Sequence, residues 1–403
     1  MSTLVPTVHE RLARCGTRVF VDGLASGAEV VLSVGGTEFS HIATGGAHTF
    51  TVPSLVPGTA VKARQDAGAG FSPWSPEVVV EDAAVPPTSA PGLPDSVGTC
   101  SHCVRVDGLV PGCKVELLLG STVVGAGTAN RHGNLCVGVD FSKAKGRRGP
   151  LRARMYVCDV VGPESTTPLV ADLALPKPVV GSPLYGCQRV VPLSNLRRGA
   201  RVRLETDTPT DLGSICSCWT AVNVRVGPEL VPGERVRARL YWLGAPCAAE
   251  GPWSDWRLVV PPDEGIKPTV LAPLIAGDQI IRVDNQIIGA TLTIKIRPSE
   301  SQPAEEFGPR PASEEPEIAL NAPLAAGNVV SVVQTLCGVS IESDPVTVLP
   351  APPVVLAPVI IPPLYDCGTA VQVSNVHPGA LVRVYMDGIP VGLRWAGAAT
   401  SIS

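Results

Sequence analysis

The chain has 403 residues, a length that suits several domains better than one hydrophobic core. Its net charge of −4, with 17% charged residues, provides no basic surface for nucleic acid or an anionic membrane. Apolar residues make up 45%, and Gly and Pro number 41 each, a mixture that predicts many short strands joined by tight turns.

Neither a membrane span nor a secretory signal is expected from the hydropathy. The longest uncharged apolar run, residues 345–365, contains seven prolines, which a spanning helix does not accept. The first residues, MSTLVPTVHERLARCG, lack the continuous apolar stretch of a signal peptide. We therefore expect a protein that stays inside the cell or a chain that is a piece of something longer.

Five segments of the sequence align without gaps on a single glycine, at intervals of 85 to 90 residues. Two of them read CGTRVFVDGLASGAEVVL from Cys15 and CSHCVRVDGLVPGCKVEL from Cys100. The others begin at Cys187, Gly277 and Cys367. The anchoring glycines are Gly27, Gly112, Gly199, Gly289 and Gly379.

Each copy alternates apolar and variable residues on both sides of its turn, the pattern of two half-buried strands. Copies one to four continue with a second half, which starts at Leu55, Arg147, Leu230 and Leu324 and adds a turn, a strand, a loop and a last strand. Six or seven strands per copy predict an all-β protein, a tandem array of Ig-like antiparallel β-sandwich domains. Pro-rich linkers such as VPPTSAPGLP separate the copies and are expected to hold them apart as semi-rigid spacers. The predicted modules are 1–83, 84–175, 176–263, 264–350 and an incomplete module at 351–403.

The fifth copy is predicted to be open, because its second half is missing. A sandwich needs both sheets to bury their inner faces, so Val371, Val373, Val382 and Val384 are expected to be partly uncovered. Unpaired strand edges invite association. The sequence is thus expected to be a truncated piece of a longer repeat protein, a monomeric array that associates through this copy.

The half-repeats resemble bacterial Ig-like domains, and the endings are similar to fibronectin type III modules. The likeness lies in LVPGTAVKAR from Leu55 and in FSPWS and PWSDW, which look like a Trp-Ser-x-Trp-Ser motif. The sequence departs from the fibronectin pattern in two ways: Ala60 and Arg235 stand where a tyrosine is usual, and the usual buried tryptophan of an early strand is missing. The resemblance implies a spacer, surface-display or adhesion module at an extracellular or cell-surface location, with an unknown protein or carbohydrate as partner.

Cysteines recur in two columns, one twelve residues before the anchoring glycine and one after the sixth strand. Copies two and three hold both columns, so bridges Cys100–Cys158 and Cys187–Cys247 are candidates, with Cys113–Cys136 as another in copy two. Copy one has only Cys15 and copy four only Cys337, although a bridge within each copy should keep both or neither. The alternative is that these are small buried residues in a reducing compartment.

A zinc-stabilised interaction protein is a further alternative. Cys100, Cys103, His132 and Cys136, with Cys113 nearby, offer thiolate and imidazole ligands. A strong zinc signature needs two close pairs, and the second pair here is spaced only as His132-x3-Cys136. The cysteines therefore favour disulfides or a sandwich core, and no cofactor is expected.

The tryptophan-serine segments predict a stack of cationic and aromatic side chains. Arg235, Arg237 and Arg239 alternate along one strand and Trp253 and Trp256 lie on the next, which favours cation–π contacts. Copy one offers Lys62 and Arg64 with Trp74. Bare indole faces would instead suit sugar rings, as in the accessory carbohydrate-binding region of a secreted hydrolase.

No catalytic signature is present in the sequence, so a non-enzymatic role is predicted. HERLA from His9 lacks the second histidine of a metalloprotease motif, and GLASG from Gly23 is a repeat turn. The acidic group around Glu314 is interpreted as a solvated loop.

Overall fold

The computed structural model describes residues 3–9, 11–68, 70–144, 149–171, 174–208, 210–243, 247–262, 267–299, 301–354, 357–364, 370–386, 389–396 and 401–402. Within these ranges the regular structure is β-strand, apart from one 3-10 turn, η1 (Phe141–Ala144). No helix in the described ranges is long and apolar enough to cross a membrane. The all-β class predicted from the alternating runs is confirmed. We keep the five predicted modules as names, and their boundaries stay a prediction.

Modules 3 and 4 each consist of two sheets with the same strand order. The strands of module 3 are β17 (Val179–Val180), β18 (Leu184–Tyr185), β19 (Val190–Ser194), β20 (Arg201–Thr206), β21 (Asp211–Cys216), β22 (Val222–Arg225), β23 (Arg235–Trp242), β24 (Ala249–Trp253) and β25 (Arg257–Val260). Those of module 4 are β26 (Thr269–Val270), β27 (Leu274–Ile275), β28 (Ile280–Asp284), β29 (Thr291–Arg297), β30 (Glu305–Pro311), β31 (Glu317–Ala319), β32 (Val329–Leu336), β33 (Val339–Glu342) and β34 (Val346–Leu349).

One sheet of module 3 has the order β17-β19-β22, and the other has β18-β25-β23-β20-β21 with β24 beside β23. Module 4 repeats this as β26-β28-β31 and β27-β34-β32-β29-β30 with β33 beside β32. The first segment of each module contributes one strand to each sheet: β17 or β26 to the smaller sheet and β18 or β27 to the larger one. In the larger sheet this strand pairs in parallel with the last strand of the module, β18 with β25 and β27 with β34. All other strand pairs of the two modules are antiparallel, as expected for an Ig-like sandwich.

Modules 1 and 2 show the same layout, except that part of the first segment pairs only through the isolated bridges Ala13–Glu81 and Gly92–Asp107. Module 1 contains β1 (Thr7–Val8), β2 (Arg18–Leu24), β3 (Glu29–Val34), β4 (Thr37–Ile42), β5 (Gly46–Thr51), β6 (Ala60–Asp66) and β7 (Val78–Val79). Its sheets are β1-β2-β5 and β4-β3-β6-β7. Module 2 contains β8 (Val97–Gly98), β9 (Cys103–Val106), β10 (Lys114–Leu119), β11 (Thr122–Thr128), β12 (Leu135–Gly138), β13 (Leu151–Val157), β14 (Val160–Val161), β15 (Ser165–Thr167) and β16 (Leu169–Val170).

The fifth module is more closed than the sequence predicts. Its strands are β35 (Val359–Ile360), β36 (Val373–Ser374), β37 (Leu381–Met386), β38 (Ile389–Trp395) and β39 (Ser401–Ile402), in a sheet β35-β36-β39 and a hairpin β37-β38. Val373 is 3% exposed and Val382 is 8% exposed, so the expectation that these two side chains are partly uncovered is wrong. Val376 and Ala396 pack with them, while Val371 and Val384 are partly buried. The sheet and the hairpin therefore shield each other's inner faces.

Alternation along the strands gives each module a hydrophobic core. Burial alternates strictly along β13 and β23, and the buried side chains form one cluster per module. Several clusters cross module borders: Leu4 of module 1 lies in the core of module 4, and Cys100 of module 2 lies in that of module 3. The modules are thus packed on one another.

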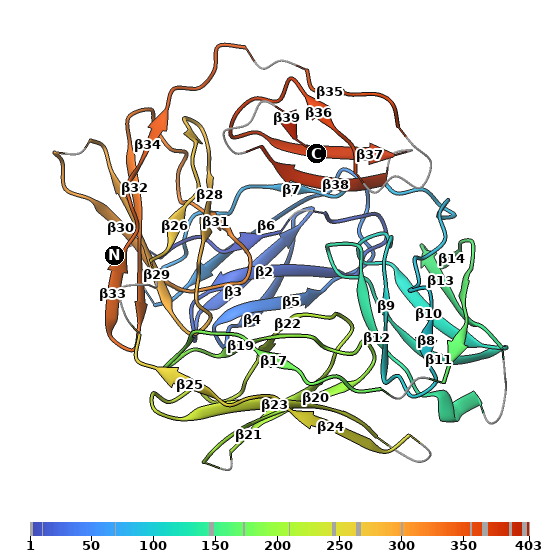
Figure 1. Cartoon of the computed structure of the whole chain (residues 1–403). Coiled ribbons are helices and arrows are strands. Elements are labelled where there is room, and N and C mark those ends of the chain that lie inside the picture. The colour runs from blue at the N-terminus through green and yellow to red at the C-terminus, as the bar shows by residue number, and fades with distance from the viewer. Residues whose placement is uncertain are drawn as a thin grey trace.

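Figure 1 shows module 1 in the middle, with modules 2 to 4 around it and module 5 above. The expected row of modules held apart by Pro-rich spacers is therefore wrong. The physical reason is a contact that recurs at the anchoring glycines of modules 2 to 5. A Cβ on Gly112 would lie 2.8 Å from the Cα of Gly16, and one on Gly289 would lie 2.4 Å from the carbonyl oxygen of Cys187. Gly199 and Gly379 touch the preceding module in the same way, whereas nothing lies within 4 Å of such a Cβ on Gly27. Glycine in this column allows each module to approach the backbone of the one before it.

Candidate functional site

The recurrent cysteines form disulfides between successive modules. Cys15 bonds Cys158, Cys100 bonds Cys247 and Cys187 bonds Cys337, with Cα–Cα distances of 5.2, 5.7 and 5.8 Å. The predicted bridges Cys100–Cys158 and Cys187–Cys247 are wrong, because the docking of one module on the next brings the first cysteine column against the second column of the following module. This stagger explains why module 1 holds only the first column and module 4 only the second.

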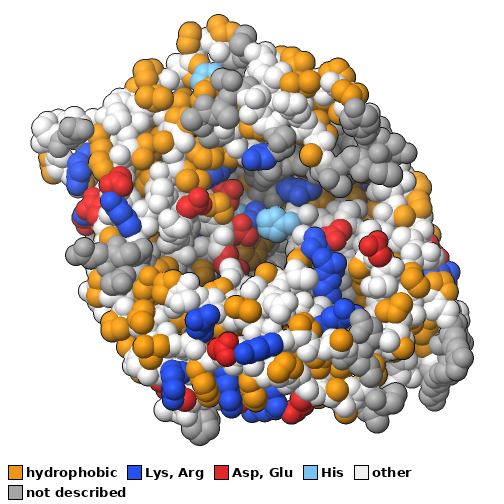
Figure 2. All heavy atoms as spheres, in the orientation of Figure 1, with side chains coloured by type: hydrophobic (Ala, Val, Ile, Leu, Met, Phe, Trp, Pro, Cys, Tyr) orange, Lys and Arg blue, Asp and Glu red, His pale blue; other side chains and the backbone are white. Residues whose placement is uncertain are grey.

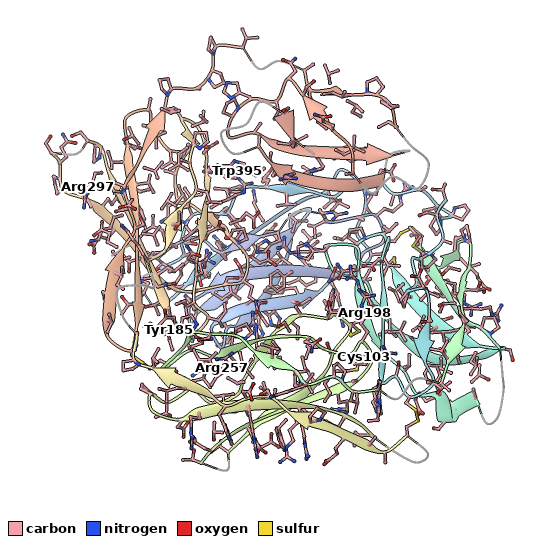
Figure 3. All side chains as sticks on the ribbon, in the orientation of Figure 1. Cys103, Tyr185, Arg198, Arg257, Arg297 and Trp395 are labelled. Atoms are coloured by element: carbon pink, nitrogen blue, oxygen red, sulfur yellow. A yellow bond between two sulfur atoms is a disulfide. The ribbon has the colours of Figure 1, made fainter. Side chains whose placement is uncertain are left out.

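Modules 2 and 3 share two further disulfides, Cys103–Cys216 and Cys136–Cys218. Figure 3 labels Cys103 where these two modules meet. The sulfur atoms of Cys103, Cys136 and Cys218 lie within 4.8 Å of one another, but all three are disulfide-bonded. The zinc hypothesis is therefore wrong for Cys100, Cys103 and Cys136, since a disulfide sulfur is not a thiolate ligand.

The predicted Cys113–Cys136 bridge is wrong as well. Cys136 bonds Cys218, while Cys113 is buried and carries a free thiol. Burial raises the pKa of the Cys113 thiol to about 12, so it is an inert core residue.

The cationic and aromatic side chains of module 3 form an alternating stack. Arg237 lies between two indole rings, 4.1 Å from the centroid of Trp253 and 4.4 Å from that of Trp256. Arg235 continues the stack beyond Trp256 at 5.7 Å, and Arg239 continues it beyond Trp253 at 4.5 Å. Carboxylates flank the stack: Arg235 donates to Asp207 and Arg237 to Glu205, at 2.9 and 2.8 Å. The cation–π arrangement expected from the alternation is present, and the stack covers the indole faces that a sugar would need.

Module 1 has a shorter version of the stack. Arg64 lies 4.4 Å from the ring centroid of Trp74 and 4.5 Å from that of Phe71, and Lys62 lies 5.6 Å from Trp74. Ser75 and Ser254 follow the tryptophans and accept hydrogen bonds from the backbone amides of Ala63 and Ala238. The serine of the motif thus links its loop to the neighbouring strand.

A buried polar cluster joins modules 1 and 4. Asp22 on β2 and Arg310 on β30 have side chains that are each 1% exposed, and an Arg310 nitrogen lies 3.4 Å from an Asp22 oxygen. Ser313 donates a hydrogen bond to Asp22 at 2.8 Å, and the buried His9 Nε2 lies 3.3 Å from the same carboxylate. Burial raises the pKa of Asp22, but the Arg310 charge, with His9 and Ser313, holds it below its ordinary value overall. Burial lowers the pKa of Arg310, and the negative charge of Asp22 opposes that shift.

Backbone contacts extend this junction along the first strand. The amide of Ala319 donates to the Thr7 hydroxyl at 3.2 Å. Asn321 accepts from the Val5 amide at 3.0 Å and donates to the Thr3 carbonyl at 3.1 Å. The chain start is therefore held on β31, more than 300 residues away in sequence.

A second polar group connects modules 2 and 4. Glu315 pairs with Arg131 and lies 3.5 Å from His132. Burial raises the pKa of Glu315, but hydrogen bonds from His132 and Arg131 and the Arg131 charge lower it to about 2. The acidic group around Glu314 is thus more than a solvated loop, since its second glutamate is a contact between modules.

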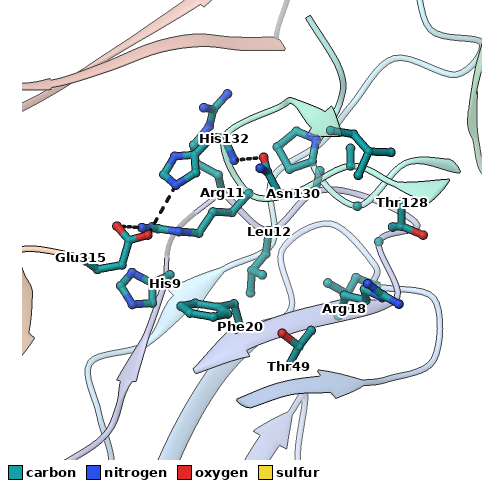
Figure 4. A pocket seen from close by; sticks show the side chains of 18 residues that line it. His9, Arg11, Leu12, Arg18, Phe20, Thr49, Thr128, Asn130, His132 and Glu315 are labelled. Atoms are coloured by element: carbon teal, nitrogen blue, oxygen red, sulfur yellow. Dashed lines mark hydrogen bonds and ion pairs between the residues drawn. The ribbon is translucent and has the colours of Figure 1, made fainter. Parts of the chain in front are cut away.

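A pocket of about 380 Å³ lies where modules 1, 2 and 4 meet. Figure 2 shows this face hollowed near its centre, with Lys, Arg, His and acidic side chains around the hollow. In Figure 4, His132 and Glu315 lie at one end of the pocket and Arg18 at the other, with Leu12 and Phe20 between them.

His9, Glu315 and Glu317 could in principle offer ligands to a metal, since their ligand atoms lie within 4.8 Å of one another. However, Glu315 pairs with Arg131, and Glu317 lies 3.7 Å from Arg282. Arginine charges already neutralise both carboxylates, so the donor set is better explained as an ion-pair network.

No motif or spacing in the sequence predicts this junction. Asp22 occupies the position before Gly23 in the repeat turn, and Arg310 and Glu315 lie outside the columns that align across the copies. Such residues meet only through the folding back of module 4 onto module 1.

Comparisons with known proteins add no family. No protein-family model matches the chain, and no curated protein matches it. Similar solved structures include the BSP domain of a biofilm-associated protein (17% identity, 43% of this chain and 29% of that chain, TM-score 0.20). Others are the FN1–FN3 domains of chicken CNTN1 (15%, 64% and 98%, 0.18) and Sidekick-1 immunoglobulin domains 1–5 (11%, 89% and 81%, 0.22).

The chain spans less than a third of the length of the biofilm-associated domain that it matches. Because these TM-scores are far below 0.5, the Ig-like fold of this chain is assigned from its own strand order and pairing.

Proposed function

We propose that the chain is a non-catalytic interaction scaffold in which Ig-like modules are clamped into one compact body. The observation that carries this proposal is the set of three equivalent disulfides that join modules 1 to 2, 2 to 3 and 3 to 4. Each closes a loop of more than 140 residues, and a constraint of that length stabilises by about 4–5 kcal/mol in the chain-entropy description.

Disulfides of this kind persist in oxidising surroundings. Five of them among the described residues support an extracellular or cell-surface location. A reducing compartment, the alternative left open by the unequal cysteine columns, fits the bonded pairs poorly.

Among the roles that the resemblance implies, adhesion or display of a protein-binding surface is supported better than spacing. A spacer gains reach by keeping its modules apart, whereas these modules fold back so that the first contacts the fourth. A protein is the proposed partner, since fixed relative positions of several modules provide a broad surface of constant shape. The carbohydrate alternative loses support because Arg237 fills the space between Trp253 and Trp256.

Small-angle X-ray scattering with and without a reductant tests the scaffold. A compact body of 403 residues has a radius of gyration of about 22 Å. We expect the oxidised protein to have a value near this and the reduced, alkylated protein to have a clearly larger one. An oxidised protein with the scattering of an extended row of modules would contradict the proposal.

A further inference from the structure

The floor of the pocket at the junction of modules 1, 2 and 4 consists of side chains that alternate with the core residues along β2. Residues two apart on a strand face the same side. Val19 and Val21 of β2 point into the core, so Arg18 and Phe20 face outward, and Thr49 lies opposite Phe20 on β5. The floor is therefore the outer face of the sheet β1-β2-β5, which water would cover in an isolated module.

Neighbouring modules build the walls over this face. Module 2 contributes Thr128, Asn130 and His132, and module 4 contributes Glu315. The volume of about 380 Å³ lies in the range of small-molecule sites. Disulfide Cys15–Cys158 and the Arg131–Glu315 pair hold the walls in place, so the pocket exists before a ligand arrives.

Charge is distributed unevenly along the pocket. At one end Glu315 is already neutralised by Arg131. At the other end Arg18 is exposed, and no carboxylate of the described residues lies within 4 Å of its guanidinium. Leu12, Leu55 and Phe20 line the space between these ends. An occupant therefore meets the exposed cation of Arg18, an apolar middle and a polar far end.

We propose that this pocket binds a small organic carboxylate, with the carboxylate on Arg18 and an apolar body over Phe20 and Leu12. A guanidinium presents two parallel N–H donors that match the two oxygens of a carboxylate. A cation is disfavoured by Arg18, and a neutral apolar molecule leaves its charge without a partner. The inference goes beyond the scaffold role, since it concerns a small ligand and not a protein partner.

Ligand-observed saturation-transfer NMR with phenylacetate as the probe tests this inference on the oxidised full chain. We expect saturable binding that is at least tenfold weaker for the neutral analogue phenylacetamide. Arg18→Gln should weaken phenylacetate binding at least tenfold, because the exposed side chain is removed without loss of core packing. Arg18→Lys, which keeps the charge but not the planar pair of donors, should show an intermediate affinity.

Arg198→Gln is the matched control, because Arg198 is an exposed arginine of module 3 that does not line this pocket (Figure 3). It should bind phenylacetate as the unmodified protein does. Thermal unfolding of both glutamine variants checks that each is folded. The inference is overturned if phenylacetate does not bind the unmodified protein, if folded Arg18→Gln binds it equally well, or if phenylacetamide binds as tightly.

Discussion

Two kinds of junction hold the modules together, and they differ in chemistry. Successive modules are joined covalently: a disulfide and a close-packed glycine recur at the junctions from module 1 to module 4. Modules 1 and 4, far apart in sequence, are joined without a covalent bond, through Asp22, Arg310, Ser313 and the first strand.

The difference shows how a repeat protein can close on itself. Covalent clamps fix the angle between neighbours, and repetition of that angle brings module 4 back to module 1, where buried polar groups complete the contact. The covalent junctions should respond to reductant, whereas the polar junction should respond to charge removal and pH. The predictions below separate the two.

The largest effect is expected from Arg310→Met. Removal of one partner from a buried ion pair leaves an uncompensated charge and costs about 3–5 kcal/mol. Asp22 would be left with His9 and Ser313 as its polar partners. Faster amide exchange in residues 3–9 would show that the junction of modules 1 and 4 opens.

Arg225→Gln is the control for that substitution. Arg225 and Glu314 form an exposed pair at 3.8 Å, with side chains 61% and 42% exposed. Loss of such a pair costs less than about 1 kcal/mol. Equal effects of the two substitutions would contradict the distinct role of Arg310.

Acid should weaken the contact between modules 2 and 4 through Glu315. Its pKa is about 2 in the folded protein and lies near the ordinary 4.5 when the chain is unfolded. A lowered pKa gives stability that is present above pH 4.5 and is lost as the pH falls towards 2. At about 1.4 kcal/mol per unit, the loss is on the order of 3 kcal/mol.

The Glu315→Gln variant isolates this contribution, because Glu116 has a similarly low pKa within module 2. Unfolding free energies measured from pH 6 to pH 2 should fall more steeply for the unmodified protein than for the variant. Parallel curves would exclude Glu315 as a pH-sensitive contact.

Gly289→Ala probes the glycine contact at a covalent junction, and Gly27→Ala is its matched control. Both positions have positive φ, so both variants carry the backbone strain of a left-handed alanine. Only at Gly289 would the new Cβ also collide with the backbone of Cys187. We expect Gly289→Ala to cost about 1–3 kcal/mol more than Gly27→Ala in chemical denaturation. Equal costs would mean that the glycine column serves the turn alone.

The smallest effect is expected inside a module, where neither junction is touched. Arg237→Ala removes two partly exposed cation–π contacts of ~0.5–1 kcal/mol each in module 3, together with the ion pair to Glu205. Arg189→Ala removes only an exposed pair with Glu229 and should have almost no effect. Thermal unfolding should rank the two in this order, while scattering should show the same compact body for both.

The module fold was predictable because its signals are local. Alternation at Val19 and Val21, the turn glycines and the serines that follow Trp74 and Trp253 are all local features, and the periods translate directly into strands. The cysteine pairing was predictable in part. If the first-column cysteine of each module bonds the second-column cysteine of the next module, every cysteine of the two columns in modules 1 to 4 has a partner.

The closure of the array was beyond the sequence pattern. Asp22 and Arg310 are separated by 288 residues. Aspartate recurs at the position of Asp22 in copies two and four, but Arg310 lies outside the aligned columns. Their contact depends on the summed angles of three junctions, which no local spacing encodes. For the same reason the pocket over Arg18 and Phe20 appears only when three modules are in place.

Disulfide mapping of the non-reduced protein by mass spectrometry of its peptides tests the covalent clamp most directly. The account predicts peptides linked through Cys15–Cys158, Cys100–Cys247 and Cys187–Cys337. Peptides linked through Cys100–Cys158 and Cys187–Cys247, each within one module, would contradict it.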